Sequence, residues 1–147
     1  MGYGHHRINT SDIEEHKNFW GQGLSWNIVS VGESIAQLVS FPNLLVFLTA
    51  RPPTGGTRRS IVNHVGLNYR HSPRRGPSNR HRIGPQVEGN IIAFVLGSDG
   101  VKVELIENKT NANEIQLHHI YWAATEGEEM RAWYTEHFSR ISGTRIG

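Results

Sequence analysis

The stretch Asn63-His64-Val65-Gly66-Leu67-Asn68-Tyr69 decides the fold, because it places a histidine at the mouth of an alternating apolar strand. Two other stretches resemble it. One is Gly4-His5-His6-Arg7-Ile8-Asn9-Thr10 near the beginning, and the other is Leu117-His118-His119-Ile120-Tyr121-Trp122 near the end. The first and the last are each followed by the pattern of a short amphipathic helix.

The spacing within these two units is the same. Trp20 follows His5 by 15 positions, and Trp133 follows His118 by 15 positions. A unit that recurs with fixed internal spacing indicates an architecture built from repeated modules.

Length and composition indicate one domain, or two small modules that share a core. The 147 residues are enough to bury roughly two thirds of the unfolded surface. The sequence has no cysteine, which excludes a disulfide framework and a thiolate metal site, and suits a reducing compartment. No apolar run approaches the ~20 residues of a membrane span, and the first residues are too polar for a signal peptide. We therefore expect a cytoplasmic protein without membrane contact.

The charge gives little support for nucleic-acid binding. The net charge is +2, and most of the excess comes from Arg70 to Arg82. One basic segment is weaker evidence for a nucleic-acid partner than a basic face spread over a fold. We expect no nucleic-acid partner, and we interpret these arginines as a solvated loop rather than as a site for an anionic substrate.

Residues 1–50 predict a β-α-β-β-β module. The segment Ser11-Asp12-Ile13-Glu14 has the form of a capping box with the serine as cap, and Gly21 and Gly23 end the helix. Short strands are expected around a turn after residue 31, followed by an apolar strand over residues 43–49 that would be buried on both faces.

The rest of the chain predicts a second, shortened module and a fragment of another. Residues 51–62 form a Pro-Pro and Gly-Gly linker, and residues 63–108 the second module, with an irregular loop over 71–89. Ser98-Asp99-Gly100 predicts a hairpin turn. Residues 109–147 read as a strand and a helix that open a further module. We expect Trp20, Trp133 and Tyr134 to lie in the core.

Three residues are candidates for metal chemistry. His5 and His64 hold equivalent places in two copies of one unit, and Glu104 lies on the last strand of the second copy. Two imidazoles and one carboxylate form a set that binds iron(II) or a similar divalent ion. Each residue also has an ordinary interpretation, a surface histidine or the solvated face of a strand, so only their joint placement favours a metal.

These segments resemble the vicinal oxygen chelate superfamily, which includes glyoxalases, bleomycin-resistance proteins and extradiol dioxygenases. The resemblance is carried by residues 4–13 with Phe19-Trp20, by Val62 to Leu67, and above all by Ala93 to Glu107, with its Asp-Gly turn and Val-Glu-Leu. It implies an α+β fold in which paired β-α-β-β-β modules form an open β cup around a metal. It also implies that His5, His64 and Glu104 are the metal ligands.

The sequence departs from the family pattern in three places. Phe47 stands where the glyoxalase branch has a further glutamate, which moves the expected ligand set toward the dioxygenase type. A helix and a strand of the second module are expected to be missing within 71–89. The C-terminal strand and helix could dock in that gap or pair with another chain, and we therefore expect a homodimer by module pairing or exchange.

The sequence thus predicts a metal-dependent enzyme, a dioxygenase or lyase, acting on a small substrate that chelates a divalent metal through vicinal oxygens. Fe(II) or Mn(II) is favoured, with Zn or Ni as further options. Two alternatives stay open: a non-catalytic binding protein of the bleomycin-resistance type, and a truncated inactive homologue. Glu107 is the nearest candidate for a general base. His118 corresponds to His5 and could belong to a third, incomplete site, and the role of His119 stays open.

Overall fold

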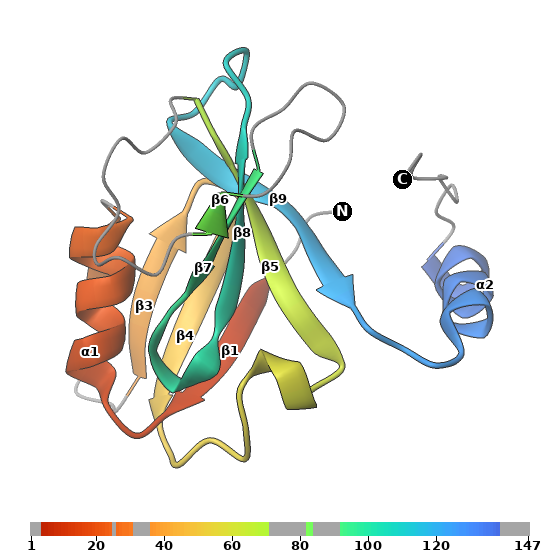
Figure 1. Ribbon diagram of the computed structural model, residues 1–147, viewed down its shortest axis with the longest axis horizontal. Coiled ribbons are helices and arrows are strands. Elements are labelled where there is room, and N and C mark those ends of the chain that lie inside the picture. Colours follow the sequence, from red (N-terminus) through yellow and green to blue (C-terminus); the bar gives the residue numbers. More distant parts are fainter. Residues whose placement is uncertain (1–3, 25, 31–35, 71–81, 84–91, 139–147) are drawn as a thin grey trace.

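The computed structural model describes residues 4–24, 26–30, 36–70, 82–83 and 92–138, and it shows an α+β protein with two mixed β-sheets (Figure 1). The predicted fold class is thereby confirmed. Along the chain the strands and helices are β1 (His5–Thr10), α1 (Ile13–Lys17, continued by a π-helical segment over Asn18–Gly23), β2 (Asn27–Ser30), β3 (Ala36–Phe41), β4 (Leu44–Ala50), β5 (Val62–Tyr69), β6 (Arg82–Ile83), β7 (Ile92–Leu96), β8 (Lys102–Glu107), β9 (Ile115–Trp122) and α2 (Gly127–Phe138).

The two sheets share one strand order. The first sheet runs β1-β4-β3-β2, with β1 parallel to β4 and the other pairs antiparallel. The second runs β6-β7-β8-β5-β9, with β5 parallel to β8 and β9 antiparallel to β5. In both sheets the first strand of the module therefore lies beside its last strand. This arrangement is the pair of modules that the sequence predicted, with β9 added outside β5.

The second module differs from the prediction in one place. The expected irregular loop over 71–89 lies outside the described residues, except for Arg82 and Ile83. These two residues form β6, which pairs with β7 as β2 pairs with β3 in the first sheet. A short counterpart of β2 is therefore present where the sequence pattern suggested that a strand was missing.

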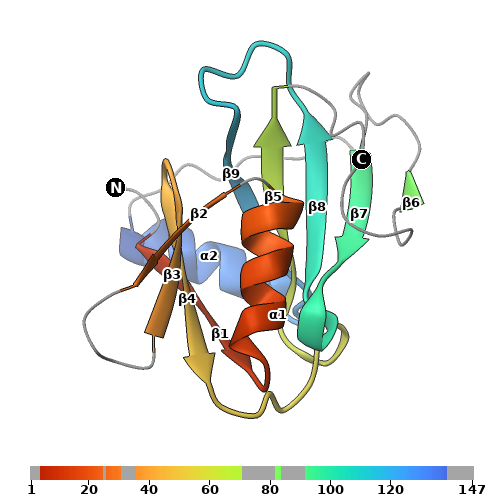
Figure 2. The same ribbon diagram turned by 90° about the vertical axis from the view of Figure 1, so that its left-hand side faces the viewer.

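Helix α1 joins the two modules into one core. In Figure 2 it lies in front of the junction between the two sheets. Its N-cap is Asp12, whose side chain accepts a hydrogen bond from the Glu15 amide at 2.9 Å, so the predicted capping by Ser11 is wrong. Trp20 is 1% exposed and confirms its predicted place in the core. The core draws apolar side chains from both sheets, among them Ile8, Val46, Leu48, Val65, Leu67, Val103 and Leu105.

A polar contact also fastens α1 to the second module. His16 is fully buried, and its Nε2 lies 3.1 Å from Oδ2 of Asp99 in the turn between β7 and β8. Trp20 Nε1 donates to His16 Nδ1 at 3.3 Å, so Nε2 carries the proton that goes to Asp99. Asp99 and Gly100 have φ values of 52° and 71°, and the predicted Asp-Gly turn is confirmed.

Strand β4 lies between β1 and β3 but is not buried on both faces as expected. Leu44, Val46 and Leu48 are buried, whereas the residues between them are half-buried. Phe47 is one of these, and its ring contacts the ring of His5. The first sheet therefore packs one face into the core and leaves the other partly open.

Helix α2 lies apart from the two sheets, at the end of the segment that leaves β9 (Figure 1). None of its residues is buried. The prediction that Trp133 and Tyr134 lie in the core is wrong, because these side chains are 49% and 36% exposed. The described helices are all too short or too polar to cross a membrane.

Candidate metal centre

Three side chains from the second sheet meet at one point. They are His64 on β5, Glu104 on β8 and His119 on β9. His64 Nε2 lies 3.1 Å from His119 Nε2, and Glu104 Oε2 lies 3.3 Å from the first nitrogen and 3.1 Å from the second. The three potential ligand atoms therefore form a nearly equilateral triangle.

The strand register explains why these side chains meet. Gly66 on β5 pairs with Glu104 on one side and with His119 on the other. Directly paired residues point to the same face of a sheet, and His64 shares that face because it lies two positions before Gly66. The opposite face carries Val65 and the other residues of the apolar core.

Gly66 leaves the space that the His119 ring occupies. A Cβ atom at this position would lie less than 3.0 Å from Cε1, Nδ1 and Nε2 of His119. Any side chain at position 66 would therefore push the imidazole away from His64 and Glu104. The backbone itself does not require glycine here, because φ of Gly66 is not positive. The His119 ring is what requires it.

Neighbouring groups direct the ring nitrogens of both histidines. Asn63 Oδ1, which only accepts, lies 2.9 Å from His64 Nδ1, so this nitrogen carries a proton, and in the neutral ring Nε2 presents a lone pair to a metal. His119 Nδ1 lies 2.7 Å from His118 Nδ1. Such a partner on the far nitrogen is the usual way in which proteins orient a metal-binding imidazole.

The carboxylate is buried and charged. Glu104 is 3% exposed, and its Oε2 lies 3.1 Å from His119 Nε2 and 3.3 Å from His64 Nε2. Burial raises the pKa of Glu104, but the adjacent His119 and His64 lower it by more, so the pKa lies well below its usual range. A buried negative charge beside two inward-facing nitrogens favours a cation between them.

The triangle has the dimensions of one face of a metal coordination sphere. Bonds of about 2.1 Å at right angles put ligand atoms about 3.0 Å apart, close to the 3.1–3.3 Å found here. The donor set and its spacing therefore fit a divalent ion of the kind that two imidazoles and one carboxylate bind.

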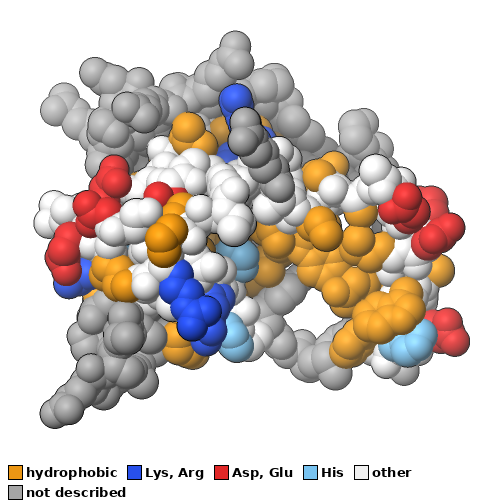
Figure 3. Space-filling view, turned by 90° about the horizontal axis from the view of Figure 1, so that it is seen from below, with side chains coloured by type: hydrophobic (Ala, Val, Ile, Leu, Met, Phe, Trp, Pro, Cys, Tyr) orange, Lys and Arg blue, Asp and Glu red, His pale blue; other side chains and the backbone are white. Residues whose placement is uncertain are grey.

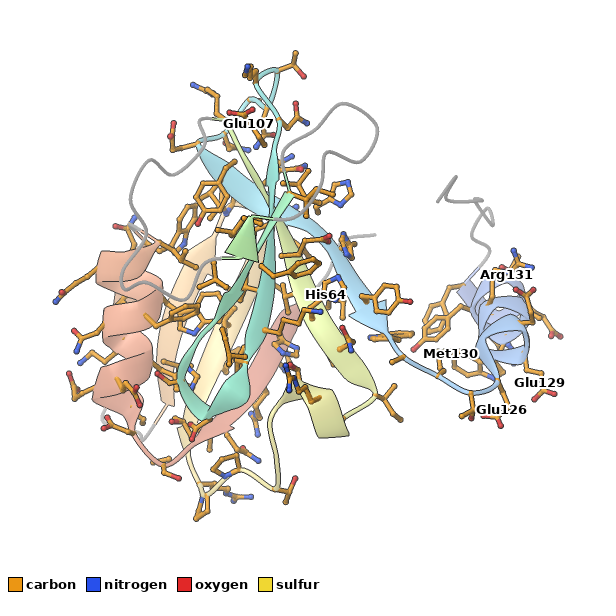
Figure 4. All side chains as sticks on the ribbon, in the orientation of Figure 1. His64, Glu107, Glu126, Glu129, Met130 and Arg131 are labelled. Carbon is orange, nitrogen blue, oxygen red and sulfur yellow. The ribbon has the colours of Figure 1, made fainter. Side chains whose placement is uncertain are left out.

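Two aromatic side chains pack against His64. The Tyr121 ring stacks on the His64 ring with centroids 4.8 Å apart and an interplanar angle of 5°. Phe94 approaches His64 edge-on at 5.5 Å. Figure 4 shows His64 near the middle of the sheet and Glu107 at its far upper end. Glu107, which the sequence suggested as a base, therefore lies away from the cluster.

The structure brings together two of the three predicted ligands. His64 and Glu104 lie in the cluster, but His5 lies on β1 in the first sheet, where it is exposed and packs edge-on against Phe47 at 4.9 Å. The third position is taken by His119. The repeat had related His118, not His119, to His5.

The signal for His119 was present in the sequence, as one of two adjacent histidines. The choice between them depends on a register shift between β5 and β9. Gly66 pairs with His119, whereas the next residue, Leu67, pairs with Leu117. This irregularity turns His119 toward Glu104, and no sequence pattern indicates it.

Comparisons with known proteins bear on the fold. No protein-family model matches the sequence, and no curated protein matches it. Among solved structures, a glyoxalase-family protein from Bacillus anthracis matches at 12% identity and a TM-score of 0.52, covering 74% of this chain and 94% of its own.

Two further structures are similar at a lower level. A bleomycin-binding protein solved in complex with bleomycin is 16% identical, with coverages of 74% and 98% and a TM-score of 0.49. A lactoylglutathione lyase from Agrobacterium tumefaciens is 13% identical, with coverages of 75% and 96% and a TM-score of 0.48. The match to the Bacillus anthracis structure and the shared strand order of the two modules show that the chain has the fold of that glyoxalase-family protein.

Proposed function

We propose that this protein is a metal-dependent enzyme of the glyoxalase or extradiol-dioxygenase type, acting on a small substrate that chelates a divalent metal through vicinal oxygens. The observation that supports it is the triangle of His64 Nε2, His119 Nε2 and Glu104 Oε2, with sides of 3.1–3.3 Å. His64 and Glu104 are both less than 7% exposed. Surface histidines and solvated glutamates neither lie so deep nor converge in this way.

In this proposal His64, His119 and Glu104 hold the ion, and His5 has no part in it. Fe(II) or Mn(II) suits two imidazoles and one carboxylate best, and Zn or Ni is compatible with the same donors. The bound ion would polarise a substrate oxygen and orient the two adjacent oxygens of the substrate. Asn63 and His118 keep the two imidazoles oriented for this task.

The aromatic residues give the substrate a surface to lie on. Tyr121 is 46% exposed although its ring stacks on His64, so part of its face is open to a ligand. A planar substrate with two adjacent oxygens could pack against this ring while its oxygens reach the ion.

Elemental analysis of protein produced without an affinity tag tests the proposal. We expect close to one equivalent of divalent metal in the wild type and a large loss in Glu104→Gln, which keeps the shape and removes the charge. Glu107→Gln, a glutamate on the same strand and away from the cluster, is the matched control and should keep the metal. Equal metal content in the two variants, or none in the wild type after reloading, would rule the proposal out.

A metal-free binding protein is the second candidate, favoured by the open aromatic ring of Tyr121. It predicts that small planar molecules raise the melting temperature equally well with and without a chelator. The metal enzyme predicts that the chelator abolishes the shift.

We also propose a homodimer in the cytoplasm. Helix α1 buries Trp20, but α2 leaves Trp133, Tyr134 and Phe138 exposed at 36–49%. Because β9 and α2 repeat the spacing of β1 and α1, a second copy of the chain is the partner we propose for this aromatic face. Light scattering should give twice the chain mass, and Phe138→Ser should shift it toward the monomer, whereas a monomeric wild type would contradict the dimer.

A further inference from the structure

Lys102 lies on the same face of the second sheet as the candidate metal centre. It is two positions before Glu104 on β8 and therefore points to the same side. Its Nζ lies 4.2 Å from the centre of the Phe94 ring and 3.4 Å from Asn63 Oδ1. The same Asn63 oxygen accepts a hydrogen bond from His64 Nδ1 at 2.9 Å. This oxygen therefore bridges the Lys102 ammonium and a proposed metal ligand.

This ammonium has no anionic partner in the described part of the chain. Its side chain is half-buried, and no described carboxylate lies within ion-pair distance of Nζ. The nearest charged residue of opposite sign on its strand, Glu104, faces the two histidines instead. A half-buried lysine held over an aromatic ring without a counter-ion keeps an unsatisfied positive charge.

Basic side chains also gather on one face of the molecule (Figure 3). Seen from below in Figure 3, lysine and arginine side chains gather beside histidine side chains, and the acidic side chains lie toward the two ends of the molecule. A divalent ion held by one carboxylate and two neutral imidazoles would add a further net positive charge. Both charges would attract a ligand that carries a negative group in addition to its chelating oxygens.

We propose that Lys102 binds an anionic group, such as a carboxylate, on a substrate whose adjacent oxygens chelate the metal. This inference rests on the proposed metal centre and specifies the substrate class for it. Phe94 and Asn63 hold the ammonium in place, and the stacked ring of Tyr121 provides a wall for the part of the substrate between its two ends.

Two chelators that differ only in charge test the proposal. 3,4-Dihydroxybenzoate and 3,4-dihydroxybenzamide share the pair of adjacent oxygens and the planar ring, but only the first carries a carboxylate. Calorimetric titration of zinc-loaded protein should give at least about 10-fold tighter binding of the benzoate, as expected for a hydrogen bond to a charged group. The preference should fall as salt is added, because salt screens this charge pair.

Lys102→Met should remove the preference, and Lys102→Arg should retain most of it. The zinc content and melting temperature of each variant show whether it is folded and loaded, and Lys102→Gln replaces the methionine variant if that one unfolds. Equal affinity for the two chelators in zinc-loaded wild type, or an unchanged preference in Lys102→Met, overturns the role of Lys102 and leaves the metal centre intact. A wild type that takes up no zinc overturns the metal centre and this inference together.

Discussion

The segments β1–α1 and β9–α2 have similar sequences and opposite roles. Each contains two adjacent histidines and carries a tryptophan 15 positions after the first of them. In the first segment one face of the helix is buried, with Trp20 at 1% exposure, and His5 is exposed. In the second the helix is exposed, with Trp133 at 49%, and His119 joins the buried cluster of His64 and Glu104.

The strand partner explains the difference. β1 pairs in parallel with β4 at the edge of its sheet, and the chain then returns as a helix across the junction of both sheets. β9 pairs antiparallel with β5, and the chain leaves it away from the core (Figure 1), so that α2 meets β9 through the ring contact of Trp122 with Tyr134 and keeps its residues unburied. The same local pattern therefore supplies core in one module and site residues in the other.

The largest expected effect is the difference in stability loss between truncating Trp20 and truncating its counterpart, Trp133. Trp20→Ala should lower the free energy of unfolding by about 3–5 kcal/mol, because it leaves a cavity at a buried site in the core. Trp133→Ala, its counterpart on α2, should change it by less than about 1 kcal/mol. Urea denaturation of both variants measures the difference, and equal losses would contradict the contrast between the two helices.

The next effect concerns the space beside His119. Gly66→Ala should weaken metal binding by about 10–100-fold, because the new methyl group overlaps the imidazole ring and turns it away. Gly4→Ala, next to the histidines of β1, is the control, since an added Cβ there meets nothing within 4 Å. Metal titration of both variants checks this. Wild-type affinity in Gly66→Ala would mean that His119 is not needed.

Much of the fold could be predicted from sequence because its signals are local. The alternating strands, the Asp99-Gly100 turn and the apolar face with Trp20 each depend on near neighbours in the chain. His64 and Glu104 could also be found, because each lies on a clearly patterned strand. His119 could not, because it depends on how β9 pairs with β5, including a shift in register after Gly66. The exposure of Trp133 likewise depends on tertiary packing, which the helical pattern does not contain.

A smaller effect concerns the pH dependence of stability, which should respond differently to histidine substitutions on α1 and on α2. Burial lowers the pKa of His16, and the nearby Asp99 offsets this only in part. The folded protein therefore binds fewer protons than the unfolded chain, and stability should fall as the pH drops below about 6.5, the ordinary value for histidine.

Unfolding free energies measured between pH 8 and pH 5 test this. On the acid side, His16→Gln should reduce the slope of the unfolding free energy against pH. The reduction should be at most that of one proton, about 1.4 kcal/mol per pH unit. His137→Gln on the exposed α2 should leave the profile unchanged. If His16→Gln has the wild-type slope, the buried His16–Asp99 contact does not control the response.

The smallest effect is expected at the end of β5, where Tyr69 pairs with Ile115 of β9. The Tyr69 hydroxyl is buried and has no hydrogen-bond partner within the described residues, and burial raises its pKa. Tyr69→Phe removes this unsatisfied group without leaving a large cavity. Its melting temperature should equal or slightly exceed that of the wild type, and a clear decrease would reveal a partner for the hydroxyl.

The most direct measurement is a metal titration of two histidine variants, one from each of the repeated segments. Calorimetry with Mn(II) or Zn(II) should show that His119→Ala loses at least about 100-fold in affinity, whereas His5→Ala binds like the wild type. Both variants should remain folded, because neither side chain belongs to the apolar core. Loss of binding in His5→Ala with retention in His119→Ala would contradict the placement of the metal between β5, β8 and β9.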